Sequence, residues 1–469
     1  MQFNARILSE SDIERVEAQA LLVLERVGMT VDNDALSELA RRRGAVVDGR
    51  YVRLPAELVR WALQVAPRHI QLHGRNGDVL PLEHGQCHLS TYAEAVNVVD
   101  YGATHMRPST LKDTLAFVRL GQAMPEINIV GPVCFARDLP APVQLLRTAE
   151  VVVLNSDKHN QAAPLNLEEA ELWYDLAQLA APDQNPVTQP PVTFVVSSTS
   201  PLQFDGDTSQ VMQFAAERKI PFIAASCPMA GGTSPLALIG TIVQHLAEDL
   251  FLLTMAQLVN TGAPVIMGGA AGLLDVRTGA LSYGAPERHL LLGAVIELAD
   301  HYGLPHHSPA GSVDACYPDV HAGAEKMQCW MARRAHGIMY GVGFGSLYNG
   351  SAVSLEQMII DADLWQEAGR YYRGLDLSTL DESSAVIERV GAGGNFLTEP
   401  QTLRLMRSQE VYYSRIANRQ GDLGPGMLER AHQQVERLLA KQAEVLAGSA
   451  AEAVRRYVAE RETKLLAVR

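Results

Sequence analysis

The sequence is poor in basic residues and in long apolar runs, and each shortage excludes a class of partner. Its 39 Lys and Arg residues against 53 Asp and Glu residues give a net charge of −14. Such a chain repels the phosphate backbone of nucleic acid overall. No uninterrupted apolar run reaches the roughly 18 residues of a membrane span, and the first residues lack the pattern of a signal peptide. We therefore expect neither a nucleic-acid nor a membrane partner.

Cysteine is also scarce. The five cysteines are odd in number, widely spread and without a C-x-x-C pair. This usage is typical of the reducing cytoplasm, where thiols are mostly small buried apolar groups. We expect a cytoplasmic protein.

Motifs for several common chemistries are absent. The sequence contains no G-x-S-x-G elbow and no H-E-x-x-H pair, and no lysine lies on an expected strand to form a Schiff base. The loop CPMAGGTSP, from Cys227 to Pro235, has the outline of an anion cradle at a helix N-terminus. However, no lysine follows its glycines as in a P-loop. Phosphate binding here, or at the glycine-rich GVGFG of residues 341–345, is a disfavoured alternative.

Histidines and cysteines near each other in the sequence leave a zinc site as another alternative. The potential ligands are His84, Cys87, His88, His306, His307, Cys316 and His321. Adjacent histidines on one strand point to opposite faces, so at most one of His306 and His307 faces the same centre. We expect one histidine in a pocket wall, the other in packing, and no metal.

A pattern of strand, loop and helix begins near residue 127 and repeats about seven times. The expected strands are INIVGP, NQAAP, VTFVVSSTSP, FIAASCP, VIMGG, HHSPA and IMYGVG. Strands that alternate with helices form a parallel sheet, and seven or eight units over about 250 residues fit a (β/α)8 barrel of the TIM type. An open doubly wound sheet is the alternative. Nearly all strands end in X-Pro or Gly-Gly, which favours one continuous rim and hence the barrel.

This repeated pattern predicts that the chain is divided into three regions. Residues 1–125 are expected to form an N-terminal extension of helices and hairpins, with a capping box at Ser11–Glu14 and a hairpin turn at Asn76-Gly77. Residues 126–373 would form the barrel. Residues 374–469 would form a C-terminal helical extension packed on the barrel, and we expect a homo-oligomer.

The active site of such a barrel lies at the C-terminal ends of its strands. No residue there is assigned as a catalytic acid or base, because aromatic, amide and small side chains predominate. The candidate substrate-binding residues are Tyr92, Phe135, Gln161, Met229, His307, Tyr340, Phe344, Tyr348 and Asn349. The candidate cofactor-facing residues are Gly231, Gly232, Thr233, Gly268 and Gly269.

Several of these stretches resemble the trimethylamine methyltransferase family. The similar segments are NVVDYGATHMRPSTLKD, STSPLQF, PMAGGTSPLALIGTIVQHLAEDLFLLTMAQLVNTGAPVIMGG, VGFGSLYNGSAVSLEQMIIDAD and GAGGNFL. The resemblance implies a barrel that passes a methyl group from a methylated amine to the Co(I) corrinoid (cobalamin) of a separate partner protein docked over its mouth. It also implies no tightly bound cofactor. Because the chain has only standard residues, it resembles the non-pyrrolysine branch, which is associated with quaternary amines such as glycine betaine.

The chemistry of quaternary amines agrees with this residue inventory. Loss of a methyl group leaves a neutral tertiary amine, so catalysis needs positioning more than a general acid. Aromatic faces hold a cation for about 0.5–2 kcal/mol each. A substrate carboxylate would meet His307, Gln161, Asn349 or backbone N–H groups, and the small residues near Gly231 would leave room for the partner's corrinoid. Two alternatives remain, namely a folate or other small-molecule methyl acceptor and a non-catalytic binder of methylated amines.

Overall fold

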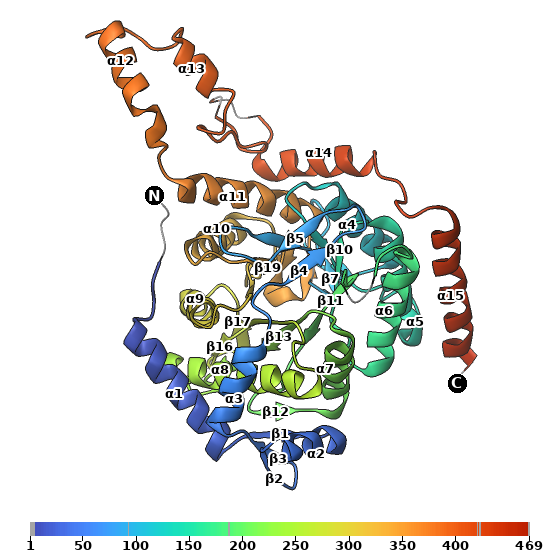
Figure 1. Cartoon of the computed structure of the whole chain (residues 1–469). Coiled ribbons are helices and arrows are strands. Elements are labelled where there is room, and N and C mark those ends of the chain that lie inside the picture. Colours follow the sequence, from blue (N-terminus) through green and yellow to red (C-terminus); the bar gives the residue numbers. More distant parts are fainter. Residues whose placement is uncertain (1–4, 92, 186–187, 420, 422–423, 468–469) are drawn as a thin grey trace.

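An eight-stranded parallel β-barrel forms the centre of the structure, a computed structural model that describes residues 5–91, 93–185, 188–419, 421 and 424–467 (Figure 1). Hydrogen bonds join the strands in the order β15-β13-β11-β10-β9-β6-β19-β18. A parallel bridge between Met267 and His306 connects the two outer strands of that order. The barrel strands are β6 (His88–Ser90), β9 (Ile129–Val130), β10 (His159–Ala162), β11 (Val192–Val196), β13 (Phe222–Ser226), β15 (Val265–Gly269), β18 (His307–Pro309) and β19 (Tyr340–Val342). The expected mixed α/β barrel is confirmed.

Eight helices follow the barrel strands and surround them. They are α4 (Leu111–Ala123), α5 (Ala141–Asn155), α6 (Leu167–Ala180), α7 (Gly206–Arg218), α8 (Leu238–Val259), α9 (Pro286–His301), α10 (Val320–Ala335) and α11 (Leu355–Arg373). Among the described residues, α8 alone is long and apolar enough to cross a membrane by length and composition, and 72% of its apolar window is buried. It contacts α1 (Glu10–Arg26), α2 (Asp34–Arg42) and α3 (Ala56–Val65), so its apolar faces are used in packing.

A β-hairpin closes the N-terminal end of the barrel. Strands β4 (Gln71–His73) and β5 (Val79–Pro81) pair antiparallel around the predicted Asn76-Gly77 turn. Leu72 and Leu80 of this hairpin pack with Ile223 and Ile266 inside the barrel. The barrel interior is therefore blocked by apolar side chains at this end.

The N-terminal part differs from expectation in two details. The barrel begins at β6, within the region that sequence analysis assigned to the extension, because β6 pairs with β9 and β19. The division into three domains stays a prediction. Helix α1 is capped by Ser9, whose side chain forms a capping box with Asp12, not by Ser11. The same short sequence offers two serine caps, and the structure uses the earlier one.

Within the described part of the chain, three small sheets of more than two strands pack around the barrel. One contains β1 (Met29–Val31), β2 (Val46–Asp48), β3 (Tyr51–Arg53) and β12 (Gln203–Phe204), and β12 belongs to the loop between β11 and α7. At the C-terminal ends of the barrel strands lie a sheet of β7 (Asn97–Val98), β8 (Arg107–Pro108), β20 (Ser346–Leu347) and β21 (Ala352–Val353) and a sheet of β14 (Met229–Ala230), β16 (Gly272–Asp275) and β17 (Ala280–Ser282). These two sheets are built from loops of the barrel rim.

The C-terminal region has two parts. Helix α14 (Met427–Leu439) packs on α11 and α4, and α15 (Gly448–Ala467) packs on α5 and α6. Between α11 and α14, residues 374–411 form an arm that stands away from the barrel and contains α12 (Leu380–Val390) and α13 (Pro400–Leu405) (Figure 1).

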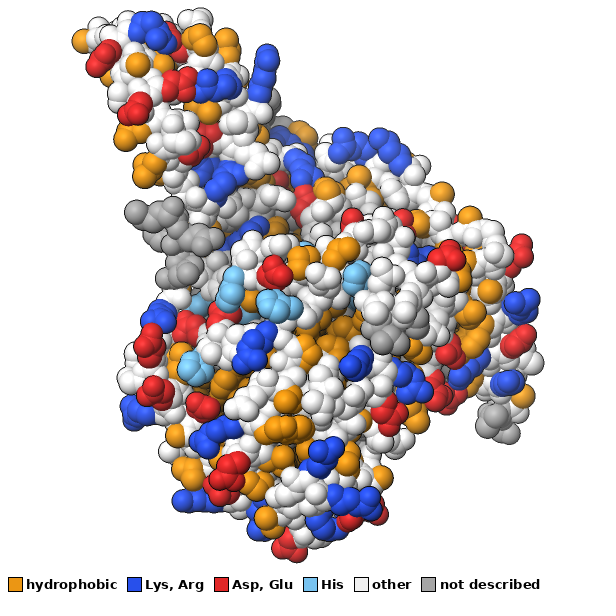
Figure 2. All heavy atoms as spheres, in the orientation of Figure 1, with side chains coloured by type: hydrophobic (Ala, Val, Ile, Leu, Met, Phe, Trp, Pro, Cys, Tyr) orange, Lys and Arg blue, Asp and Glu red, His pale blue; other side chains and the backbone are white. Residues whose placement is uncertain are grey.

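The arm exposes apolar side chains. In its two helices Val386 alone is buried, and Figure 2 shows apolar side chains distributed over the arm surface. Its large exposed apolar residues are Leu375, Leu377, Leu380, Ile387, Phe396, Leu397, Leu403, Met406 and Val411.

Candidate active site

Three buried side chains lie together inside the barrel, on three different strands. Gln161 is on β10, Tyr340 begins β19 and His307 begins β18. The Tyr340 hydroxyl donates a hydrogen bond to Gln161 Oε1 at 2.7 Å, and the His307 ring stands edge-on to the Tyr340 ring with centroids 5.5 Å apart. The structure therefore brings together three of the candidate residues, and we call them the barrel floor.

The floor is electrically neutral and has unused hydrogen-bonding atoms. Burial lowers the pKa of His307 to about 3, with a further contribution from His306. Burial raises the pKa of Tyr340 well above its usual range. Within the described structure, Gln161 Nε2 and both His307 ring nitrogens have no hydrogen-bond partner. A neutral aromatic and amide surface with free polar atoms can orient a small polar ligand, but it offers no charged acid or base.

The residues that follow β19 are divided between core and rim. Phe344 is fully buried and packs on Trp330 of α10, with ring centroids 5.0 Å apart. Tyr348 is 43% exposed. Asn349 adopts a left-handed backbone with φ +53°, and its N–H donates to Val313 O in the loop after β18. The structure thus separates Phe344 from the rim positions of Tyr348 and Asn349.

The remaining candidates for substrate binding lie on other rim loops. Phe135 follows β9, is half-buried, and donates its N–H to Ala95 O. Met229 is half-buried and pairs through β14 with Gly272 of β16. Tyr92 lies outside the described residues.

The five residues predicted to face a cofactor occupy two settings. Gly231, Gly232 and Thr233 form a tight turn, in which the N–H groups of Gly232 and Thr233 donate to Met229 O and Gly231 adopts φ +85°. Gly231 and Gly232 are exposed at the rim.

Gly268 and Gly269 instead end strand β15 and are buried. A Cβ on Gly268 would lie 3.0 Å from His307 Nδ1, and one on Gly269 would lie 2.4 Å from His245 Nε2. Close packing against two histidines explains why these positions take glycine.

Sequence reasoning missed Glu248, a buried carboxylate that connects two rim loops. It accepts hydrogen bonds from Ser198 Oγ and Ser200 Oγ, at 2.9 and 2.7 Å, in the loop after β11. It also accepts one from Gln244, which in turn donates to Thr233 O in the glycine turn. Glu248 is on α8, where every residue from 245 to 258 is buried. A charged residue within such an apolar helix is the signal that could have indicated a structural role.

The histidines considered as zinc ligands are dispersed. His306 Nε2 lies 3.1 Å from Asp300 Oδ1, outside the barrel wall, and His321 Nε2 lies 2.9 Å from Glu325 Oε1 on α10. Among the described residues, no group of three or more His, Cys, Asp or Glu side chains could hold a metal ion.

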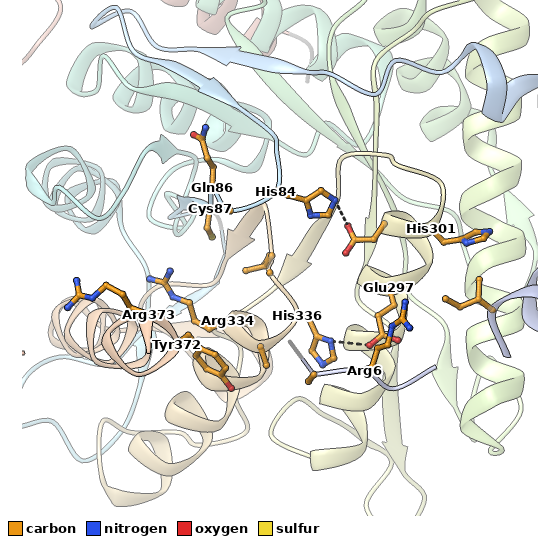
Figure 3. Close-up of a pocket in the computed structure, with 18 of the residues that line it drawn as sticks. Arg6, His84, Gln86, Cys87, Glu297, His301, Arg334, His336, Tyr372 and Arg373 are labelled. Carbon is orange, nitrogen blue, oxygen red and sulfur yellow. Dashed lines mark ion pairs between the residues drawn. The ribbon is translucent and has the colours of Figure 1, made fainter. Parts of the chain in front are cut away.

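A large hollow lies at the opposite end of the molecule. It has a volume of about 880 Å³ and is lined by the residues before β6 and by the C-terminal ends of α9, α10 and α11. Figure 3 shows His84, Arg334, His336 and Arg373 around it, with ion pairs from His84 to Asp300 and from His336 to Glu297. Because the hairpin β4–β5 blocks the barrel at this end, the hollow does not reach the barrel floor.

Comparison with known proteins agrees with this geometry. The profile of the trimethylamine methyltransferase family matches residues 2–465. The chain belongs to that family and is a methyltransferase.

Two named relatives are similar to this chain over most of its length. The chain is 30% identical over 423 residues to the glycine betaine methyltransferase of Desulfitobacterium hafniense, with 88% of this chain and 87% of the relative covered. It is 29% identical over 408 residues to a trimethylamine methyltransferase of another strain of that species, with 86% and 82% covered. The crystal structure of the monomethylamine methyltransferase of Methanosarcina barkeri superposes with a TM-score of 0.56 at 12% identity, over 95% of this chain and 89% of that one, which supports the barrel fold.

Proposed function

We propose that the protein removes a methyl group from a small, glycine betaine-like quaternary amine and passes it to the Co(I) corrinoid of a partner protein. The observation that supports this substrate best is the neutral floor of Gln161, Tyr340 and His307. A quaternary amine needs no proton when it leaves, so a site without a charged acid or base suits it. The glycine betaine methyltransferase relative supports the same substrate class.

The Tyr340 ring and neutral His307 have complementary roles in this proposal. The aromatic edge-to-face pair gives a methylammonium group polarisable surfaces, while Gln161 holds the Tyr340 hydroxyl in place. Since the floor carries no negative charge, it does not over-stabilise the cationic substrate relative to the transition state, in which the charge on nitrogen decreases. The corrinoid, when bound by the partner, supplies the nucleophilic cobalt.

Exposed apolar side chains on the rim support docking of that partner over the barrel mouth. They come from the segments that follow five different barrel strands, and each is at least 43% exposed: Leu165, Leu236, Val276, Val320 and Tyr348. Isolated exposed apolar residues are ordinary on a protein surface, but a set around one opening is typical of an interaction site.

A direct assay with the full chain tests the proposal. The enzyme is mixed with reduced cobalamin and glycine betaine, and loss of the Co(I) absorbance is followed. We expect methylcobalamin to form, and we expect Gln161→Ala to reduce the rate about tenfold or more because Tyr340 loses its hydrogen-bond acceptor. Gln213→Ala, on the outer part of α7, is the matched control and should leave the rate unchanged.

Two other outcomes would each support a different function. Demethylation that requires tetrahydrofolate and not cobalamin would support a small-molecule acceptor. Betaine binding by calorimetry without methyl transfer to either acceptor would support a non-catalytic binder.

We also propose that the protein is a cytoplasmic homo-oligomer. All five thiols are free, which suits a reducing compartment. The arm begins where α11 ends, and α11 runs from the barrel mouth to the opposite face, so a partner on the mouth does not reach the arm. A second copy of the chain is therefore the proposed cover for the arm's apolar side chains.

A further inference from the structure

Two arginines are fully buried between the barrel and its outer helices. Arg288 lies in the first turn of α9, at the end of that helix nearest the mouth. Arg333 lies in the last turn of the neighbouring helix α10, and its side chain extends from there toward the mouth. Both are 0% exposed. Arg333 Nε donates to Pro309 O, at the C-terminal end of β18, over 3.3 Å. Both guanidinium groups therefore lie behind the rim loops that surround the candidate active site.

These guanidinium groups are incompletely satisfied. In the part of the chain that the structure describes, Arg288 Nε and Nη2 and Arg333 Nη1 have no hydrogen-bond partner, and neither arginine forms an ion pair. The best contact of Arg288 is a 3.4 Å hydrogen bond from Nη1 to Tyr283 O. A buried charge without a counter-charge is strongly unfavourable, by several kcal/mol in typical proteins. A bound anion would therefore stabilise this site.

The side chains packed around the two arginines are mostly neutral. Burial raises the pKa values of Cys329 and Tyr283, so both are neutral near pH 7. One carboxylate, Asp314, opposes through space the lowering of the Arg288 pKa by burial, but it forms no ion pair with that arginine. Its oxygens accept hydrogen bonds from Ser282 Oγ and from the Tyr283 N–H.

The neighbouring histidine keeps the cluster at two positive charges. His289 Nδ1 lies 3.3 Å from Arg333 Nη2 and accepts its hydrogen bond. Burial lowers the pKa of His289 to about 3, and the two arginines lower it further. His289 is thus a neutral acceptor that orients Arg333.

Taken with the proposed function, on which this step rests, we propose that Arg288 binds the carboxylate of the substrate, with Arg333 adding charge behind it. The unpartnered Nε and Nη2 atoms of Arg288 form the side of the guanidinium that binds a carboxylate through two parallel hydrogen bonds. The Tyr283 ring lies 4.2 Å from the Arg288 guanidinium carbon and is part-exposed at the rim. The enzyme therefore binds a betaine at both ends, with the ammonium at the floor and the carboxylate at Arg288.

Calorimetry on the full chain tests this assignment without any methyl acceptor. Glycine betaine is compared with tetramethylammonium, which has the cation and no carboxylate. For Arg288→Met we expect betaine affinity to fall about 10- to 100-fold, the usual effect of losing a charge-assisted pair, and tetramethylammonium affinity to change less than about threefold. The matched control is Arg334→Met, at a half-buried arginine stacked on Trp365 beside the opposite hollow, and this variant should bind both ligands as the wild type does.

An experiment on the wild type avoids dependence on a variant that fails to fold. Acetate, a carboxylate without the cation, should compete with betaine and should bind together with tetramethylammonium. Acetate that competes with neither ligand, or equal losses of both ligands in a folded Arg288→Met, would overturn the assignment. Chloride that raises the melting temperature of the wild type, with betaine affinity unaffected by Arg288→Met, would also overturn it and identify a resident halide.

Different results would contradict the carboxylate site at Arg288 and the proposed function. Arg288-dependent betaine binding without methyl transfer to cobalamin would contradict the function and support the carboxylate site. Methyl transfer from betaine that is unchanged in Arg288→Met would support the function and contradict the site.

Discussion

His159, His245, His289 and His307 are buried in an electrically neutral form, and His307 is the one on the barrel floor. Burial lowers the pKa of His159 and His245 to about 4 and that of His289 and His307 to about 3. An unfolded histidine titrates near pH 6.5. Between these values the unfolded chain binds more protons than the folded one, so acid favours unfolding.

Stability should therefore fall as the pH is lowered from about 6.5 toward about 4, and His307→Gln should make that dependence shallower. Comparing the variant with the wild type cancels the contributions of other titrating groups. Urea unfolding at several pH values between about 7.5 and 5 measures both slopes. His69→Gln, at an exposed histidine, is the control. Parallel curves for wild type and His307→Gln would contradict a neutral buried His307.

Sequence reasoning identified the floor residues because they lie on strands near a predictable rim. It did not separate Phe344 from them, because a residue two positions after a strand can turn inward or outward. Here Phe344 packs on Trp330. It also missed Arg288, which lies in a helix turn instead of a strand end. Burial without a partner marks that arginine, and only coordinates show burial.

At the scale of elements, a buried ion pair holds the loop after β19. Lys326 Nζ on α10 lies 2.7 Å from Asp361 Oδ2 on α11, and both side chains are 0% exposed. Lys326 also donates to Gly343 O, while Asp361 accepts the Gly345 N–H. Two helices thus fix the backbone of the loop that leads to Tyr348.

Lys326→Met should destabilise the fold by about 3–5 kcal/mol, because it leaves Asp361 buried without its counter-charge. The double variant Lys326→Met with Asp361→Leu should recover part of that loss. Urea denaturation of the two variants and the wild type gives the free energies of unfolding. A loss below about 1 kcal/mol in the single variant would show that Asp361 is stabilised by its other hydrogen-bond donors.

Seven of the eight barrel strands could be predicted from sequence, because buried parallel strands appear as apolar runs between helices. β6 could not. It has three residues, His88–Ser90, two of them polar, and the hairpin β7–β8 intervenes before the next helix. Its strand character depends on hydrogen bonds to β19 and β9, which lie far away in the sequence.

For the whole molecule, the arm and the hollow lie side by side. Tyr372 and Arg373, which line the hollow, directly precede the arm. A two-fold axis near this point would place the arm of each copy against the hollow of the other. Interfaces of this self-complementary kind are the commonest in homo-oligomers.

Replacing Leu380 and Ile387 together by Asp should therefore shift the protein toward monomer, because two carboxylates would take the place of apolar side chains that the interface buries. Size-exclusion chromatography with light scattering measures the molar mass, and the melting temperature checks the fold. Val276→Asp, at an equally exposed residue on the opposite face, should leave the mass unchanged. A wild-type protein that is monomeric at micromolar concentration would contradict the proposal.

The hairpin that blocks the barrel with Leu72 and Leu80 has a consequence for the order of events during turnover. A barrel with one open end has a single route in and out. Under the proposed function, the amine enters before the methyl acceptor covers that opening, and the demethylated amine leaves only after the acceptor departs. Steady-state kinetics should therefore be compulsorily ordered, with the amine binding first and its product leaving last, and excess acceptor should inhibit by occupying the opening of the empty enzyme.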